Sequence, residues 1–143
     1  MSKSDVFEND LLELIFNGTA IPNLAINATA SPLTNLYISL HTADPGEAGT
    51  QSTSETTYTS YARVAVARTS GGWTVTANSV SPVANIDFPA CTAGGPHTIT
   101  FFGVGSAASG AGVLYYSGSV SPSISVSSGV TPRLTTASTI TED

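Results

Sequence analysis

Short segments of alternating apolar and polar residues, separated by turn-forming residues, make up the chain from residue 35 onward. In the first of them, 35–42, Leu36, Ile38 and Leu40 alternate with more polar residues. Such alternation places two sets of side chains on opposite faces of a strand. Further candidates are 61–68, 70–78, 83–90, 97–105, 112–120, 123–130 and 133–141. Strands at this spacing, with Gly, Pro, Ser and Asn between them, predict an all-β fold: a jelly roll or β-sandwich of about eight short antiparallel strands.

The N-terminal residues follow a different pattern. Apolar residues recur at helical spacing between positions 6 and 16, and acidic residues occupy the opposite face. This pattern predicts one amphipathic helix before the β region. Asp5 is its expected N-cap with Glu8 as the capping-box partner, and Asn17 and Gly18 supply the left-handed C-cap.

The segment 19–35 has two prolines and no sustained period, which is typical of an extended arm or linker. We therefore divide the chain into a helix at 1–18, an arm at 19–35 and a β domain at 36–143, which together form one structural unit. The helix either lies over one end of the β core or docks partly on a neighbouring subunit. The candidate subunit-contact residues are Phe7, Leu11, Leu12, Phe16, Ile21, Leu24 and Ile26.

Charge and composition exclude several classes of function. The net charge is −6, and only four residues are Lys or Arg. A nucleic-acid or anionic-membrane surface needs a basic patch, so we expect neither partner. No apolar run is long enough for a membrane span or a signal peptide, so we expect a soluble protein made in the cytoplasm. The single Cys91 cannot form an intrachain disulfide, and we expect it to be a small buried hydrophobic residue.

Four residues with possible chemistry lie close together in the sequence: His41, Asp44, Glu47 and Glu55. Their spacing does not match a zinc or calcium motif, and Asp44 precedes Pro-Gly, a typical turn. The chain also lacks a nucleophile elbow and a Walker loop. We therefore predict no catalytic residue, no metal site and no cofactor. The stretch is interpreted as a core strand that runs into a loop at 44–60, which faces solvent or a neighbouring subunit.

Six aromatic residues leave one alternative open. They could form a platform for a sugar, although aromatic residues in a small β fold more often belong to the core or to an interface. The six are Tyr37, Tyr58, Tyr61, Tyr115, Tyr116 and Trp73.

Several motifs in one order carry a resemblance to a known family. They are LHTADP (40–45), YARVAV (61–66), IDFP (86–89) and GVGSAASG (103–110), the last followed by LYYSG. In these motifs the chain resembles small virion proteins of tailed bacteriophages, which are labelled capsid cement or decoration proteins and also tail-fibre proteins. The resemblance implies a β-sandwich or jelly-roll subunit on the virion, with no enzymatic activity.

Within this family we expect a cement protein, because the chain has neither long repeats nor a coiled-coil shaft. Such a subunit would bind the major capsid protein on the capsid surface, stabilise the capsid, and form a homo-oligomer (dimer or trimer). The alternative is a tail-fibre or tail-tip module that contacts a host receptor or carbohydrate.

Overall fold

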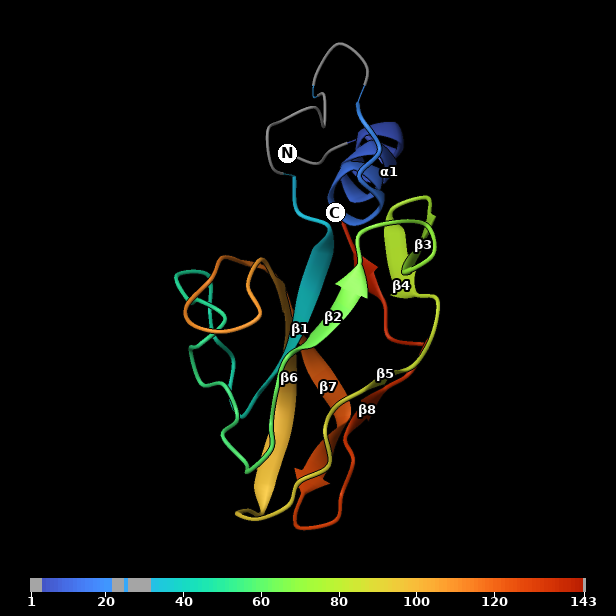
Figure 1. Cartoon of the computed structure of the whole chain (residues 1–143). Helices are drawn as coiled ribbons and strands as arrows, with labels where there is room; N and C mark the ends of the chain where they lie inside the picture. The colour runs from blue at the N-terminus through green and yellow to red at the C-terminus, as the bar shows by residue number, and fades with distance from the viewer. Residues whose placement is uncertain (1–3, 22–24, 26–31, 143) are drawn as a thin grey trace. The chain divides into compact units, whose positions relative to one another are not determined.

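The computed structural model describes residues 4–21, 25 and 32–142 (Figure 1). In this part of the chain, one α-helix and one π-helical turn precede nine strands. The prediction of an all-β fold with an N-terminal helix is confirmed. No helix of the described residues is long and apolar enough to cross a membrane. The elements are α1 (Asp5–Leu12), η1 (Glu13–Asn17), β1 (Asn35–His41), β2 (Val64–Ala67), β3 (Trp73–Thr76), β4 (Ser79–Pro82), β5 (Ile86–Asp87), β6 (His97–Gly105), β7 (Leu114–Val126), β8 (Arg133–Leu134) and β9 (Ile140–Thr141).

The chain forms two compact units, each built from segments far apart in the sequence. Unit 1 contains Met1–Asn35, Ala67–Asn85 and Leu134–Asp143, and unit 2 contains Leu36–Val66 and Ile86–Arg133. The helix and the arm thus share a unit with central and C-terminal segments. The chain passes between the units four times. The linear division into helix, arm and β domain stays a prediction.

A four-stranded antiparallel sheet in the order β2-β1-β6-β7 forms the centre of unit 2 (Figure 1). The long strand β6 lies between β1 and β7, with Ile38 opposite Val104 and Val104 opposite Tyr116. The two short strands β5 and β8 pair separately. As predicted, the apolar residues of β1 and Cys91 are buried. The core of unit 2 contains Leu36, Ile38, Leu40, Tyr58, Ile86, Phe88, Cys91, Ile99, Val104 and Val126.

Strand β7 is longer than expected, because the candidates 112–120 and 123–130 join into one strand. The register shifts between Ile99 and Phe101 of β6, so residues 120–123 of β7 lie opposite a single residue. Pro122 falls in this irregular segment, where a missing backbone N–H removes no regular ladder bond. Strand β4 was not predicted, because its residues SVSP show no clear alternation of apolar and polar side chains.

Unit 1 packs the N-terminal helix on a three-stranded sheet in the order β3-β4-β9. Ser4, rather than the predicted Asp5, is the N-cap. Its side chain accepts a hydrogen bond from the Phe7 N–H, and its backbone is extended, so the helix begins at the next residue. Both residue types cap well, so the sequence did not separate the two positions. The predicted C-cap is confirmed, with Gly18 at a φ of 69°.

The core of unit 1 is built around Phe16 and Trp73. Their rings meet edge to face with centroids 4.8 Å apart. Leu12, Phe16 and Ile21 are buried inside the chain, whereas Phe7 is 37% exposed. Leu24 and Ile26 lie outside the described residues. Leu11 is half-buried. Subunit contact through these candidates stays a prediction, and among the five that the structure describes only Phe7 is exposed.

Replacing Phe16 tests whether this ring contact holds unit 1 together. Phe16→Ala should destabilise the protein by about 3–5 kcal/mol, since it leaves a cavity beside Trp73. Trp73 is the only tryptophan of the chain, so its fluorescence during urea denaturation reports on this unit. Phe7→Ala, at an exposed aromatic of the preceding helix α1, should change stability by less than about 0.5 kcal/mol. Equal effects of the two variants would contradict the packing described here.

Candidate functional site

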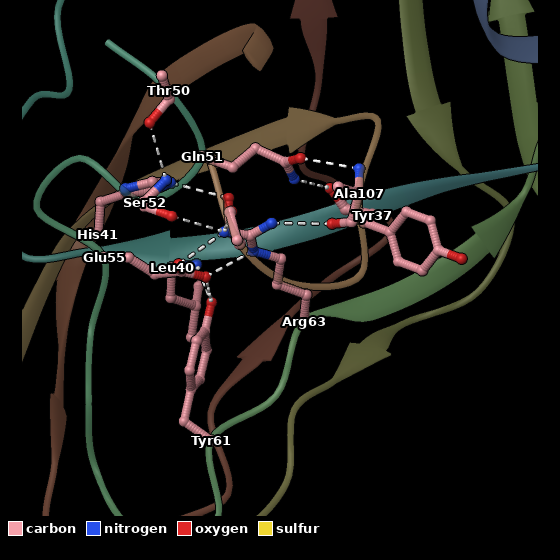
Figure 2. Close-up of polar contacts among 12 residues, drawn as sticks. Tyr37, Leu40, His41, Thr50, Gln51, Ser52, Glu55, Tyr61, Arg63 and Ala107 are labelled. Atoms are coloured by element: carbon pink, nitrogen blue, oxygen red, sulfur yellow. Dashed lines mark hydrogen bonds and ion pairs between the residues drawn. The ribbon is translucent and has the colours of Figure 1, made fainter. Parts of the chain in front are cut away.

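A buried ion pair between Arg63 and Glu55 lies at the centre of the polar contacts in Figure 2. Arg63 Nε donates to Glu55 Oε1 at 2.7 Å, and Arg63 Nη2 donates to Glu55 Oε2 at 2.8 Å. The exposed fraction of the side chain is 2% for Arg63 and 16% for Glu55. The bonds to Glu55 raise the pKa of Arg63 above its ordinary value, so the guanidinium stays charged. A two-pronged pair of this kind fixes both side chains in orientation.

Arg63 also binds the loop between β6 and β7. Its Nη1 donates to the carbonyl oxygen of Ala107 at 2.9 Å, and its Nη2 donates to that of Gly110 at 2.7 Å. One guanidinium therefore joins the segment before β2, the loop 42–60 and the loop 106–113. The last two loops also meet directly, where the Gln51 N–H donates to the Ala111 carbonyl at 2.9 Å.

Tyr61 extends the network to the sheet. Its hydroxyl donates to Glu55 Oε1 at 2.8 Å and accepts from the Leu40 N–H at 3.0 Å. Burial, opposed by the bond from Leu40 and reinforced by the nearby Glu55 carboxylate, raises the pKa of Tyr61 far above its ordinary value. The phenol therefore stays protonated and acts as a hydrogen-bond donor, not as a base.

His41 is buried and bonded at both ring nitrogens. Nδ1 lies 2.8 Å from the carbonyl oxygen of Thr53, and Nε2 lies 2.8 Å from Ser39 Oγ. A carbonyl can only accept, so Nδ1 carries the proton and Nε2 of the neutral ring accepts from Ser39. Burial lowers the pKa of His41, although the bond to Thr53 and the charge of Glu55 oppose this shift. The ring is a neutral structural element that joins β1 to the following loop.

Gln51 fills a space that two glycines leave open. Its Nε2 donates to the Tyr37 carbonyl at 3.2 Å, and its Oε1 accepts from the Ala107 N–H at 2.9 Å. A Cβ at Gly105 would come within 2.2 Å of the Gln51 side chain, and one at Gly112 within 2.3 Å. Glycine at both positions is therefore required for this side chain to bridge the sheet and the loop.

The structure separates the four residues that the sequence placed together. His41 and Glu55 are directed into the network, whereas Asp44 and Glu47 are exposed on the loop. The predicted turn is present, since Asp44 Oδ1 accepts from the Gly46 N–H at 2.9 Å. Among the described residues, no group of three or more His, Cys, Asp or Glu side chains is arranged to hold a metal ion. The stretch is therefore the end of a strand and the loop that follows it. His41 and Glu55 anchor this loop in the protein, and Asp44 and Glu47 lie on its exposed part.

The loop 44–60 is only partly solvent-facing, which corrects the prediction for it. Its residues 44 and 46–48 are exposed, but Gln51, Thr56 and Tyr58 are buried. The reason is backbone pairing, because the Thr56 N–H donates to the Leu40 carbonyl at 2.9 Å and draws the second half of the loop over β1. The burial of His41 on the supposedly more polar face of β1 has the same cause.

An open pocket lies beside the exposed half of this loop. It has a volume of about 350 Å³ and is lined by Asp44, Gly46, Glu47 and Gly49 and by residues 114–117 of β7. In the part of the chain that the structure describes, Glu47 makes no hydrogen bond or ion pair, and the only bond to the Asp44 side chain is that from Gly46. The pocket thus presents two exposed carboxylates and the segment Leu114–Ser117, in which two tyrosines adjoin.

Half of the predicted aromatic platform, Trp73, Tyr58 and Tyr61, is packed inside the protein. Trp73 packs on Phe16 in unit 1, and Tyr58 donates to the Pro89 carbonyl at 2.9 Å in unit 2. Burial raises the pKa of Tyr58 to about 12, with a smaller contribution from Cys91. Tyr58 and Tyr61 meet edge to face at 5.3 Å. Of the six aromatics, only Tyr115 and Tyr116 line the pocket.

Comparison with known proteins gives the family of the chain. A family model described as "Podophage GP4 fiber I protein gp80" matches residues 2–141. Because this match covers nearly the whole sequence, the chain belongs to that family, which places it among bacteriophage structural proteins. The predicted relation to phage virion proteins is thereby confirmed. No curated protein matches the chain.

Removing the guanidinium tests the central role of the ion pair. Arg63→Ala should destabilise the protein by about 3–5 kcal/mol, because Glu55 is then buried without its partner. Urea denaturation measures the effect. The matched control is Arg133→Ala, which breaks a second two-pronged pair with Asp87 that is exposed to solvent. That variant should unfold close to the parent midpoint. A similar loss in both variants would show that burial of the Arg63 pair has no special role.

The neutral, buried His41 predicts a stability change with pH. Its pKa is lower in the folded than in the unfolded chain, so protonation favours unfolding. The free energy of unfolding should be highest above about pH 6.5 and should fall as the pH drops toward the folded-state pKa. Urea denaturation at about pH 7.5 and about pH 5 measures this. His41→Gln should reduce the slope; an unchanged slope in this variant would contradict the assignment.

Proposed function

We propose that this chain is a component of the phage tail fibre that contacts the host surface. The observation that carries the proposal is the match of residues 2–141 to a podophage fibre-protein family. It favours the tail-fibre alternative over the capsid-cement interpretation. The absence of long repeats does not oppose it, because a fibre can contain small separate modules at its joints or tip.

The structure of unit 2 suits a module that presents a contact surface. Loops carry binding function best when a rigid scaffold positions them. Here Arg63 bonds to Glu55 in the loop 42–60 and to Gly110 in the loop 106–113. Gln51, which is part of the loop 42–60, bonds to Tyr37 of β1 and to Ala107 in the loop 106–113. The two loops therefore share one set of buried anchors, and their outer residues are held in a fixed arrangement before a partner binds.

The remaining expectations enter the proposal as follows. The chain acts in the virion by binding, without a catalytic step or a cofactor. Copies of the chain associate as a dimer or trimer in the fibre, with Phe7 of α1, which is exposed, as one candidate contact. Contact with the major capsid protein belongs to the cement interpretation, which the same experiment tests.

Locating the chain on the particle distinguishes the two interpretations. Phage carrying an epitope tag on this chain should bind antibody-gold at the tail, as seen by electron microscopy. Particles that lack the chain should adsorb to host cells at least about tenfold more slowly, while their capsids resist heat as the parent capsids do. Label over the capsid shell, together with heat-sensitive capsids, would overturn the proposal and support capsid cement.

A further inference from the structure

Tyr115 occupies an irregular position in β7 next to the pocket. Leu114 pairs with Gly105 and Tyr116 pairs with Val104, so Tyr115 is an extra residue without a partner on β6. This is a β-bulge, a feature that redirects a side chain and is common beside binding sites. Tyr115 is 41% exposed, and Tyr115 and Tyr116 both line the pocket. The bulge thus interrupts the regular alternation of β7 at the residues that border the loop 44–49.

The opposite wall of the pocket is a tight turn with two carboxylates. Asp44 accepts from the Gly46 N–H, and the Gly49 N–H donates to the Gly46 carbonyl at 3.0 Å. A Cβ on Gly49 would approach the Pro45 carbonyl oxygen to 2.2 Å, so this turn requires glycine there. The turn is then followed at once by Gln51, which the buried network holds. The backbone that carries Asp44 and Glu47 is therefore held in a defined turn, and both side chains are exposed to solvent.

We infer that this pocket binds a neutral saccharide of the host surface. The inference deepens the proposed function, since it names the ligand class and the site of a fibre module. A tyrosine ring offers an apolar face to the C–H groups of a sugar ring and a hydroxyl at its edge. Carboxylates accept strong hydrogen bonds from sugar hydroxyls. The volume of about 350 Å³ suits a small ligand or a short part of a glycan.

The charge of the pocket determines which saccharides it accepts. Its lining includes Asp44 and Glu47 and no Lys, Arg or His, and the whole chain carries a net charge of −6. A sugar carboxylate or phosphate brought into this site would lie against like charges without a cationic partner, which suppresses binding. The pocket therefore selects uncharged glycans over sialylated, uronic-acid or phosphorylated ones.

Titration of the full-length, ¹⁵N-labelled chain tests this inference. The probes are maltotriose and N,N′,N″-triacetylchitotriose, which are neutral, and trigalacturonic acid, which is anionic. At least one neutral probe should shift the amide resonances of residues 44, 46–49 and 114–117, whereas trigalacturonic acid should not. The absence of such shifts with both neutral probes at millimolar concentration, or equal binding of the anionic probe, would overturn the inference.

Variants connect the binding to named side chains. Tyr115→Ala should weaken the neutral probe about tenfold, and Tyr115→Phe should retain most of the affinity. Asp44→Asn, which preserves an oxygen for the Gly46 N–H, and Glu47→Gln should each weaken it roughly tenfold. Phe7→Ala, an exposed aromatic of the other unit, is the matched control and should bind as the parent does. Unaltered binding in Tyr115→Ala would exclude this pocket as the site.

A phage experiment separates the failure of the inference from that of the proposed function. Phage carrying Tyr115→Ala should assemble normally and adsorb more slowly than the parent. If the chain is labelled at the tail but this variant adsorbs at the parent rate, the pocket inference fails and the proposed function stands. If the label lies on the capsid shell, the proposed function fails.

Discussion

The buried ion pair of Arg63 and Glu55 is the interaction on which the arrangement of unit 2 depends. Removing a guanidinium and a carboxylate from water costs several kcal/mol for each group, and the cost is offset only when nearly every polar atom finds a partner. Here the partners come from separate parts of the chain: two carbonyls of the loop 106–113, the hydroxyl of Tyr61 and, through Tyr61, the backbone of β1. If one loop moved away, the charges would remain buried without those bonds. The energetic penalty of an incomplete network therefore makes the positions of both loops depend on each other.

The same requirement explains the glycines of the segment GVGSAASGAG. Gly103 faces His41 and Ser39, because an added Cβ would lie 2.8 Å from both His41 Nε2 and Ser39 Oγ. Gly105 and Gly112 leave the space that Gln51 occupies. A run of small residues that resembles a flexible hairpin in the sequence is thus a surface that receives polar side chains from β1 and from the loop 42–60. The loop 42–60 supplies polar side chains, and the segment 103–112 supplies the space and the backbone groups that bond to them. Each segment is therefore ordered by the other.

Patterns with a short range in the sequence predicted the fold well. The period of two gave β1 and β6 nearly to the residue, and the sequence Asn-Gly gave the helix C-cap. Interactions at long range could not be predicted in this way. Residue 63 contacts residues 107 and 110 only through the pairing of β1, β2, β6 and β7. Nothing local indicates that Glu55 is half-buried and paired while Glu47 is exposed. The bulge at Tyr115 was hidden for the same reason, since a bulge is defined by the register with the partner strand.

Burial decides which of the acidic and aromatic residues in unit 2 can act on a ligand. Glu55, Tyr58 and Tyr61 have their polar atoms engaged inside the protein, so they can position other groups but cannot contact a partner. Asp44, Glu47 and Tyr115 carry the same chemical groups at the surface, on segments that the buried set holds in place. A rigid pair of loops loses little conformational entropy when a ligand binds, so even a small pocket with a few hydrogen bonds and one ring contact retains useful affinity. In the proposed fibre role, many copies of such a weak site would act together, so modest affinity at each site would be sufficient for firm attachment.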